Sequence, residues 1–178
     1  MPVSARALAE RARHVRLLLF DVDGVMTDGT VSSAASGDET KTFSIRDGAA
    51  LVWAQRAGFE VALLSGRPSQ ATARRAAELG IARVLQGPPD KRQAYQGLLK
   101  ECGVTDREVA YMGDDWLDLV ILERVGFAAA PADAMKEVRQ RVHWVSRFPG
   151  GRGAVRDLIE MMLKARRRWH DVLRRPAG

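Results

Sequence analysis

The sequence contains a single cysteine, Cys102, among its 178 residues. Cys102 has no disulfide partner within the chain, which indicates a reducing compartment, and we interpret it as a core thiol rather than a nucleophile. The chain also lacks any apolar run near the roughly 20 residues that cross a bilayer. Residues 1–6 contain no apolar core of the kind that secretory signals have. These absences predict a cytoplasmic protein with no membrane partner.

Histidine is scarce as well. The three histidines, His14, His143 and His170, do not have the spacing of metal ligands, so we assign them no chemistry. The four tryptophans are more typical of a core or an interface than of stacking platforms.

The net charge of +6 would suggest binding to nucleic acid, but the positive charge lies at the two ends of the chain. Residues 1–16 carry +3 and residues 156–178 carry +4, so the body between them is nearly neutral at −1. We therefore expect no nucleic-acid partner. The expected organisation is a basic N-terminal segment over 1–14, one domain over 15–163 and a basic tail over 164–178.

Short apolar segments alternate with helical segments from Val15 onward, which predicts an α/β fold with a parallel central sheet and helices on both faces. The expected strands follow in order: 17–20, 60–64, 83–86 and 108–112, with weaker ones near 127–130 and 142–145. The expected helices run from Asp47 through Ala57, from Pro68 to Gly80, from Asp90 to near Gly103, from about Trp116 to Val125, from Asp133 and from about Ala154.

A polar segment over 30–43, centred on Ser36-Gly37-Asp38, separates the first strand from the first of these helices. Its small and polar residues favour a β-hairpin flap close to the end of the first strand. The flap and one helix occupy most of the 43 residues between Asp21 and Ser65, and the 25 residues between Ser65 and Lys91 hold only a helix and a strand. A separate cap domain therefore has no room.

Two carboxylates, Asp21 and Asp23, directly follow the first apolar run. Side chains two apart on a strand share a face, so both should project from the strand's carboxyl end, where open α/β sheets bind ligands. Adjacent carboxylates repel unless a cation or a shared proton lies between them, and Mg²⁺ prefers such oxygen ligands. An ordinary strand-to-turn junction is the alternative. A calcium loop is disfavoured. Counted from Asp21, glycine is the fourth residue rather than the sixth, and the twelfth is Ser32 where such a loop has a bidentate glutamate.

Three later strands also lead into polar groups, namely Ser65-Gly66, the loop to Lys91, and Asp114-Asp115. Parallel strands end at one edge of the sheet, so these groups should converge on the first two carboxylates. Phosphoryl transfer would then use them as follows. Asp21 attacks phosphorus and binds Mg²⁺. Asp23 is the acid and base and a further metal ligand, Asp114 holds the metal, and Ser65, the Gly66 amide and Lys91 bind phosphate.

Two further acids are candidates for supporting roles. Asp115 would hold Lys91 or a metal-bound water. Asp118 could share the helical face of Asp114 and Asp115, or it could simply be a first-turn acid favoured by the helix dipole. Taken alone, Ser65-Gly66-Arg67 is more typical of a plain strand-to-helix turn and Lys91 of a solvated lysine, so only their common location argues for function.

Taken together, these motifs resemble the haloacid dehalogenase superfamily of phosphatases. Its four motifs match, in order, residues 21–29, residues 65–67, Lys91 and residues 113–115. A closer resemblance, to the 3-deoxy-D-manno-octulosonate 8-phosphate phosphatases, rests on three segments: 43–48 (FSIRDG), Gln86-Gly87 followed by Lys91, and 150–156 (GGRGAVR). The resemblance covers about residues 14–163, whereas the tail beyond Lys164 does not match.

The resemblance implies a Rossmann-like three-layer sandwich and a phosphatase domain over 15–163. It also implies Mg²⁺-dependent hydrolysis of an eight-carbon acidic sugar phosphate through an aspartyl phosphate, in lipopolysaccharide precursor synthesis. A homotetramer is implied as well, so neighbouring subunits would cover the open site. Arg67 and Arg46 are candidates for binding the sugar carboxylate, and Arg152 for doing so across a subunit boundary, with surface ion pairs as the alternative.

Two other functions stay open at this point. The same motifs would serve a phosphatase for a nine-carbon keto-acid sugar phosphate of the sialic acid type. From another class, the fold could be a scaffold that binds anionic partners through Arg166-Arg167-Arg168 and Arg174-Arg175, with binding that weakens steeply in salt. The full set of acids favours the enzyme.

Overall fold

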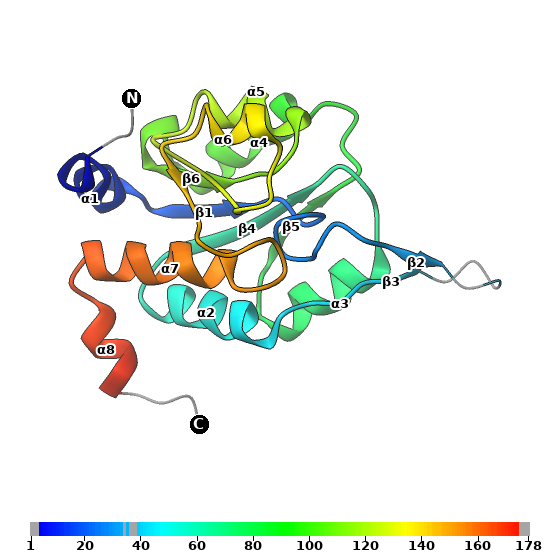
Figure 1. The fold of residues 1–178 in the computed structure, drawn as a ribbon, viewed down its shortest axis with the longest axis horizontal. Coiled ribbons are helices and arrows are strands. Elements are labelled where there is room, and N and C mark those ends of the chain that lie inside the picture. Colours follow the sequence, from blue (N-terminus) through cyan, green and yellow to red (C-terminus); the bar gives the residue numbers. More distant parts are fainter. Residues whose placement is uncertain (1–3, 34, 36–38, 175–178) are drawn as a thin grey trace.

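A computed structural model describes residues 4–33, 35 and 39–174. Figure 1 shows a central sheet between two layers of helices. Its strand order is β5-β4-β1-β6-β7-β8, and every neighbouring pair is parallel. The strands are β1 (Leu17–Phe20), β4 (Glu60–Ser65), β5 (Arg83–Gln86), β6 (Val109–Met112), β7 (Phe127–Ala130) and β8 (Trp144–Val145). The predicted α/β fold with a parallel central sheet is confirmed.

The central strand β1 is buried on both faces, which explains its unbroken apolar run. Leu18 and Phe20 belong to one core, and Leu17 and Leu19 belong to the other. The first core is covered by α2 (Ile45–Arg56), α3 (Gln70–Glu78) and α7 (Ala154–Ala165). The second is covered by α4 (Lys91–Cys102), α5 (Leu119–Leu122) and α6 (Lys136–Arg139).

Several helix boundaries differ from the predicted ones because capping residues set them. Ser44 accepts a hydrogen bond from the Asp47 amide, so α2 begins at Ile45. Ser69 caps α3 in the same way, and Pro68 lies before that cap. The helix expected from Asp133 begins only at Lys136, after Met135, and this start has no side-chain cap.

The helix expected over 116–125 is shorter than predicted. The chain forms a 3₁₀ turn, η2 (Trp116–Asp118), and then α5. The carboxylates of Asp115 and Asp118 take part in a reciprocal capping arrangement that holds this turn. A second 3₁₀ turn, η1 (Asp106–Glu108), precedes β6.

The predicted flap is a hairpin of β2 (Ser32–Ser33) and β3 (Glu39–Thr40), which pair antiparallel. It projects beyond the carboxyl ends of the parallel strands, at the right of Figure 1. The centre predicted at residues 36–38 lies outside the described residues. Among the described residues, the chain from β1 to β4 holds only this hairpin and α2, and no cap domain is inserted there.

Both basic ends of the chain form helices that we did not predict: α1 (Ala5–His14) and α8 (Trp169–Arg174). Helix α1 packs against α7 and buries Ala12. The Trp169 ring of α8 meets the Trp53 ring edge-on, with 6.3 Å between ring centroids. Both helices lie at the side of the molecule opposite the flap, at the left of Figure 1. No helix among the described residues is long and apolar enough to cross a membrane.

Candidate active site

The sheet register brings the predicted acids together. Phe20 pairs with Leu63 on one side and with Met112 on the other. Asp21 directly follows Phe20, and its amide donates to the Met112 carbonyl over 3.0 Å. Asp114 lies two residues beyond Met112, and Ser65 is the last residue of β4. These three side chains therefore begin at neighbouring points on one edge of the sheet.

Lys91 joins the acids from the first turn of α4, whose start is capped by Asp90. Its Nζ donates to Asp21 Oδ1 over 2.6 Å and to Asp118 Oδ1 over 2.7 Å. Burial acts to lower the pKa of Lys91, but the charges of Asp21 and Asp118 outweigh burial and raise that pKa. Lys91 is thus a fixed ammonium rather than a solvated surface lysine.

Asp118 is the hub of the local hydrogen bonds. Its Oδ1 accepts from Lys91 and from the Tyr111 hydroxyl, and its Oδ2 accepts from the amides of Asp114 and Asp115. The side chain is buried. Asp118 therefore orients both Lys91 and the loop that carries Asp114, a role that its position in the sequence only partly indicated.

Asp115 differs from the prediction in one respect. It is exposed, and its carboxylate accepts from the Trp116 amide at the start of η2. Lys91 donates to the buried Asp118 and not to Asp115, whose carboxylate caps the 3₁₀ turn instead. The other predicted role of Asp115, holding a metal-bound water, stays a prediction.

Carboxylate oxygens of Asp21, Asp114 and Asp118 lie within 4.8 Å of one another. Burial raises the pKa of Asp21 to about 7, with the charge of Asp118 adding to the shift and Lys91 opposing it. Burial likewise raises the pKa of Asp114 to about 8, helped by the charges of Asp118 and Asp21. Such a crowded acidic group fits a hard divalent cation. Because Asp118 already accepts four hydrogen bonds, the open ligands are Asp21 and Asp114.

The carboxylate of Asp23, which we also predicted as a metal ligand, lies outside that acidic group. Its Oδ1 is 2.7 Å from the Nζ of Lys41 in the flap. Lys41 Nζ is 3.6 Å from Glu39, and Glu39 accepts from Arg67 over 2.6 Å. Sequence reasoning missed Lys41 and Glu39, because nothing in a short polar hairpin indicates which strand it approaches.

Ser65 and Gly66 form a turn next to Lys91. The buried Ser65 hydroxyl donates to the Arg67 carbonyl over 3.1 Å and accepts from the Arg67 amide over 3.3 Å. A Cβ added at Gly66 would lie 3.9 Å from Lys91 Cε. The turn therefore brings the Gly66 backbone close to the Lys91 side chain.

Gly24 permits the close approach of the two acidic loops. Its φ is +87°, a conformation that L side chains rarely adopt, and a Cβ there would collide with the Asp114 carboxylate. Any other residue at this position would displace Asp114 from Asp21.

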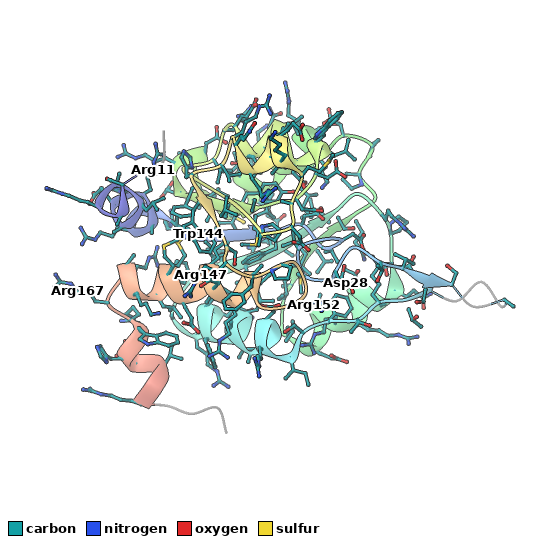
Figure 2. All side chains as sticks on the ribbon, viewed as in Figure 1. Arg11, Asp28, Trp144, Arg147, Arg152 and Arg167 are labelled. Atoms are coloured by element: carbon teal, nitrogen blue, oxygen red, sulfur yellow. The ribbon has the colours of Figure 1, made fainter. Side chains whose placement is uncertain are left out.

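The predicted sugar-binding arginines divide into two groups. Arg46 and Arg152 line one cleft of about 330 Å³ at the start of α7, together with Arg147, Phe148, Gly153, Arg156, Asp157 and Glu160. Arg67 does not line this cleft and pairs instead with Glu39 of the flap. Arg152 lies near Asp28, with 4.0 Å between the charged atoms, and the two are seen together in Figure 2.

Asp47, which we did not single out as functional, joins the segments that form this cleft. Its buried carboxylate accepts from the Gly153 amide over 3.1 Å and from the Arg156 amide over 2.8 Å. Burial raises its pKa, although these hydrogen bonds oppose the shift. Asp47 thereby caps α7 from α2 and keeps Arg46 beside Arg152.

Comparisons with known proteins agree with this geometry. A family model for haloacid dehalogenase-like hydrolases matches residues 80–156. The 3-deoxy-D-manno-octulosonate 8-phosphate phosphatase KdsC of Escherichia coli K12 is 40% identical over 164 residues, which is 92% of this chain and 87% of that protein. The crystal structure of the Yersinia pestis phosphatase of the same name has a TM-score of 0.92 at 38% identity and covers 94% of this chain and 90% of its own.

A third relative was solved with ligands. The 3-deoxy-D-manno-octulosonate 8-phosphate phosphatase of Moraxella catarrhalis, in complex with a magnesium ion, a phosphate ion and KDO, has a TM-score of 0.93 at 34% identity. The match covers 96% of this chain and 98% of that one. The similarity thus extends over nearly the whole chain.

Proposed function

The chain belongs to the 3-deoxy-D-manno-octulosonate 8-phosphate phosphatases, a family of haloacid dehalogenase-like hydrolases, and on that premise we propose how its residues work. It is a phosphatase that hydrolyses 3-deoxy-D-manno-octulosonate 8-phosphate to the free sugar acid and phosphate, a step of lipopolysaccharide precursor synthesis. The observation that carries the proposal is that Lys91 donates to both Asp21 and Asp118 at the carboxyl edge of the sheet.

Asp21 is the nucleophile. Its carboxylate attacks phosphorus, the bond from phosphorus to the sugar oxygen breaks, and an aspartyl phosphate forms. Asp23 gives a proton to the leaving oxygen and later takes a proton from the water that hydrolyses the aspartyl phosphate. Lys91, the Ser65 hydroxyl and the Gly66 amide bind the phosphate oxygens as charge develops on them. Asp118 keeps Lys91 in place.

The cofactor is Mg²⁺, which neutralises charge on the phosphate when it is bound. Asp21 and Asp114 would hold it through their carboxylates, and Asp23 is the third candidate ligand. The raised pKa values of Asp21 and Asp114 support this fit, because two buried carboxylates in one site need a cation to ionise together.

One assay tests these roles: phosphate release with Mg²⁺ from 3-deoxy-D-manno-octulosonate 8-phosphate, a nine-carbon keto-acid sugar phosphate and neutral sugar phosphates. We expect the eight-carbon ester to have the highest kcat/KM. Asp21→Asn should lower kcat by roughly 10³-fold or more, because the amide is a far poorer nucleophile. Near-parental turnover of Asp21→Asn would remove Asp21 from its role, and a preference for the nine-carbon ester would reassign the substrate.

We also propose that the phosphatase is a homotetramer in which neighbouring subunits cover the site. Large apolar side chains are exposed around the catalytic edge: Ile45 is 82% exposed, Leu117 71% and Trp116 57%. Leu117 and Trp116 directly follow the acidic loop of Asp114, so a surface that covers them would also exclude water from the site.

Analytical ultracentrifugation tests the assembly. Leu117→Asp should shift the protein to smaller species and lower kcat/KM, whereas His170→Asp, an exposed position at the opposite edge, should leave both unchanged. A parent that sediments as a monomer and still prefers the eight-carbon ester would contradict this proposal.

The buried, unpaired Cys102 supports a location in the reducing cytoplasm.

A further inference from the structure

Four charged side chains connect the predicted acid Asp23 to the surface of the flap. They alternate in sign in the order Asp23, Lys41, Glu39, Arg67, with successive separations of 2.7, 3.6 and 2.6 Å. The Lys41 side chain is fully buried, whereas 56% of the Arg67 side chain is exposed. The series therefore runs from the catalytic carboxylate to a cation that an incoming ligand can reach.

The middle of this series is incompletely satisfied. Asp23 Oδ1, Lys41 Nζ and Glu39 Oε1 are buried and make no directed hydrogen bond, although Lys41 is within 2.7 Å of Asp23. The ammonium is thus held to the carboxylate by charge, outside the angles of a good hydrogen bond. Buried polar atoms without directed partners are costly and few in folded proteins. Three of them in one series indicate an arrangement that another pairing can replace.

Lys41 has two possible partners, and Glu39 decides between them. Glu39 is engaged by Arg67 at 2.6 Å, which leaves Lys41 closer to Asp23 than to Glu39. The pKa of Glu39 is lowered, chiefly by the Ser69 hydroxyl and further by Lys41 and Arg67, so Glu39 is an anion that can accept either cation. If Arg67 leaves Glu39, Lys41 becomes its nearest cation.

We propose that this series is a relay that couples recognition of a carboxylate on the substrate to the release of Asp23. The inference rests on the proposed function, since it takes Arg67 as a ligand of the sugar carboxylate and Asp23 as the acid. When Arg67 binds the substrate carboxylate, it releases Glu39. Glu39 then attracts Lys41, and Asp23 is free to turn to the leaving oxygen. Lys41 and Glu39 are positioning residues, because they act through Asp23.

Under the relay, a phosphate ester without a carboxylate has a low kcat as well as weak binding. Such an ester leaves Arg67 on Glu39 and Lys41 on Asp23, so the acid stays restrained while the phosphate is bound. The enzyme would therefore discriminate through kcat as well as through KM.

Two variants with opposite expected effects test the relay. In Lys41→Met the restraint on Asp23 is lost, so kcat for a sugar phosphate without a carboxylate should rise about threefold or more. In Glu39→Gln nothing attracts Lys41, so kcat for the carboxylate-bearing sugar phosphate should fall about tenfold with little change in KM. Lys41→Arg should retain most of the parental discrimination, and Ser33→Ala, an exposed flap position, should change neither constant.

A role of Lys41 in substrate binding or in flap structure gives different results. Lys41→Met would then raise KM or lower kcat for both esters, and the relay is wrong. Crystal structures of the parent with and without the free sugar acid give a second readout. With the sugar acid bound, Lys41 Nζ should be nearer to Glu39 than to Asp23. An unchanged pairing of Lys41 with Asp23 would also overturn the relay.

Failure of the proposed function is distinguishable from failure of the relay. A parent that releases no phosphate from the eight-carbon ester contradicts the proposed function. The relay can then still be tested with any pair of phosphate esters that differ in a carboxylate, and equal kcat values for the parent on such a pair would overturn it.

Discussion

The two edges of the central sheet hold their charges in different ways. At the carboxyl edge, Asp21 is 5% exposed and Asp118 1%, and a single ammonium serves both. At the opposite end of the molecule, beside α8, the ion pair of Arg168 with Asp171 is open, with side chains that are 53% and 60% exposed. Buried charges cost folding free energy, whereas exposed pairs contribute little. The first edge is thus organised for chemistry and the second for solvation.

The basic tail shows the same contrast. The Arg166 guanidinium lies 4.0 Å from the Phe59 ring centroid, and the Lys164 ammonium lies 5.1 Å from that of Trp169. Arg167 extends away from the body at the far end of the molecule (Figure 2). Part of the tail's positive charge therefore covers aromatic rings, which does not favour a free cationic arm that binds anionic partners.

The largest effect on activity should come from placing a side chain in the narrow space between the two acidic loops. Gly24→Ala should lower the free energy of unfolding by at least about 2 kcal/mol and reduce phosphate release to background, because a Cβ there collides with Asp114. Gly58→Ala is the matched control at the opposite edge, with the same φ of +87° and no atom within 4 Å of the added Cβ. Equal losses of activity in both variants would show that backbone strain, and not Asp114, is responsible.

The second effect concerns the acid that holds Lys91. Asp118→Ala should lower kcat about 10- to 100-fold, because Lys91 and the loop of Asp114 lose a shared acceptor. Asp115→Ala should cost less, since that carboxylate is exposed and caps η2. Steady-state kinetics on the sugar phosphate with saturating Mg²⁺ measure both. If Asp115→Ala is the more damaging change, Asp115 and not Asp118 supports the reaction.

A third effect is a pH dependence that only the catalytic edge should produce. Asp21 and Asp114 have pKa values of about 7 and about 8 in the folded protein, against 3.8 when unperturbed. The folded state therefore binds more protons than the unfolded chain between these values, so rising pH favours unfolding of the metal-free protein. The Tm in a chelator should fall by roughly 5 °C or more from about pH 5 to pH 8.

Mg²⁺ provides the control for that measurement. It replaces the protons on both carboxylates, so saturating Mg²⁺ should raise the Tm most at the upper end of this range. A metal-free Tm that is constant or rises over the same range would mean that the two carboxylates do not share a crowded, buried site.

The smallest effect is expected at the opposite edge. Arg166→Ala should lower the free energy of unfolding by about 0.5–1 kcal/mol through loss of its contact with the Phe59 ring, and kcat should not change. Arg167 is exposed and makes no ion pair or ring contact within the described part of the chain, so Arg167→Ala should be neutral. Urea unfolding curves measure both, and a loss of turnover in either variant would connect the tail to the catalytic edge.

Much of the site could be predicted from the sequence because a parallel sheet constrains where strands end. Asp21, Ser65 and Asp114 each follow an apolar run, so their meeting at one edge needs only strand order and register. Asp118 was harder, since a helical spacing and the observed 3₁₀ turn direct a carboxylate differently. The terminal helices α1 and α8 were missed because their sequences are polar and basic, and contacts with α7 and Trp53 stabilise them.

The sequence by itself determined the α/β fold, the order of the strands' polar ends and the choice of acids, because hydrophobic periodicity and residue chemistry are local properties. Only the tertiary structure decided which charges share a partner. Lys91 lies between Asp21 and Asp118, and Lys41 reaches Asp23 from the flap, through contacts between segments far apart in the chain. Such pairings depend on distances of a few ångströms in a buried environment, which no spacing along the sequence encodes.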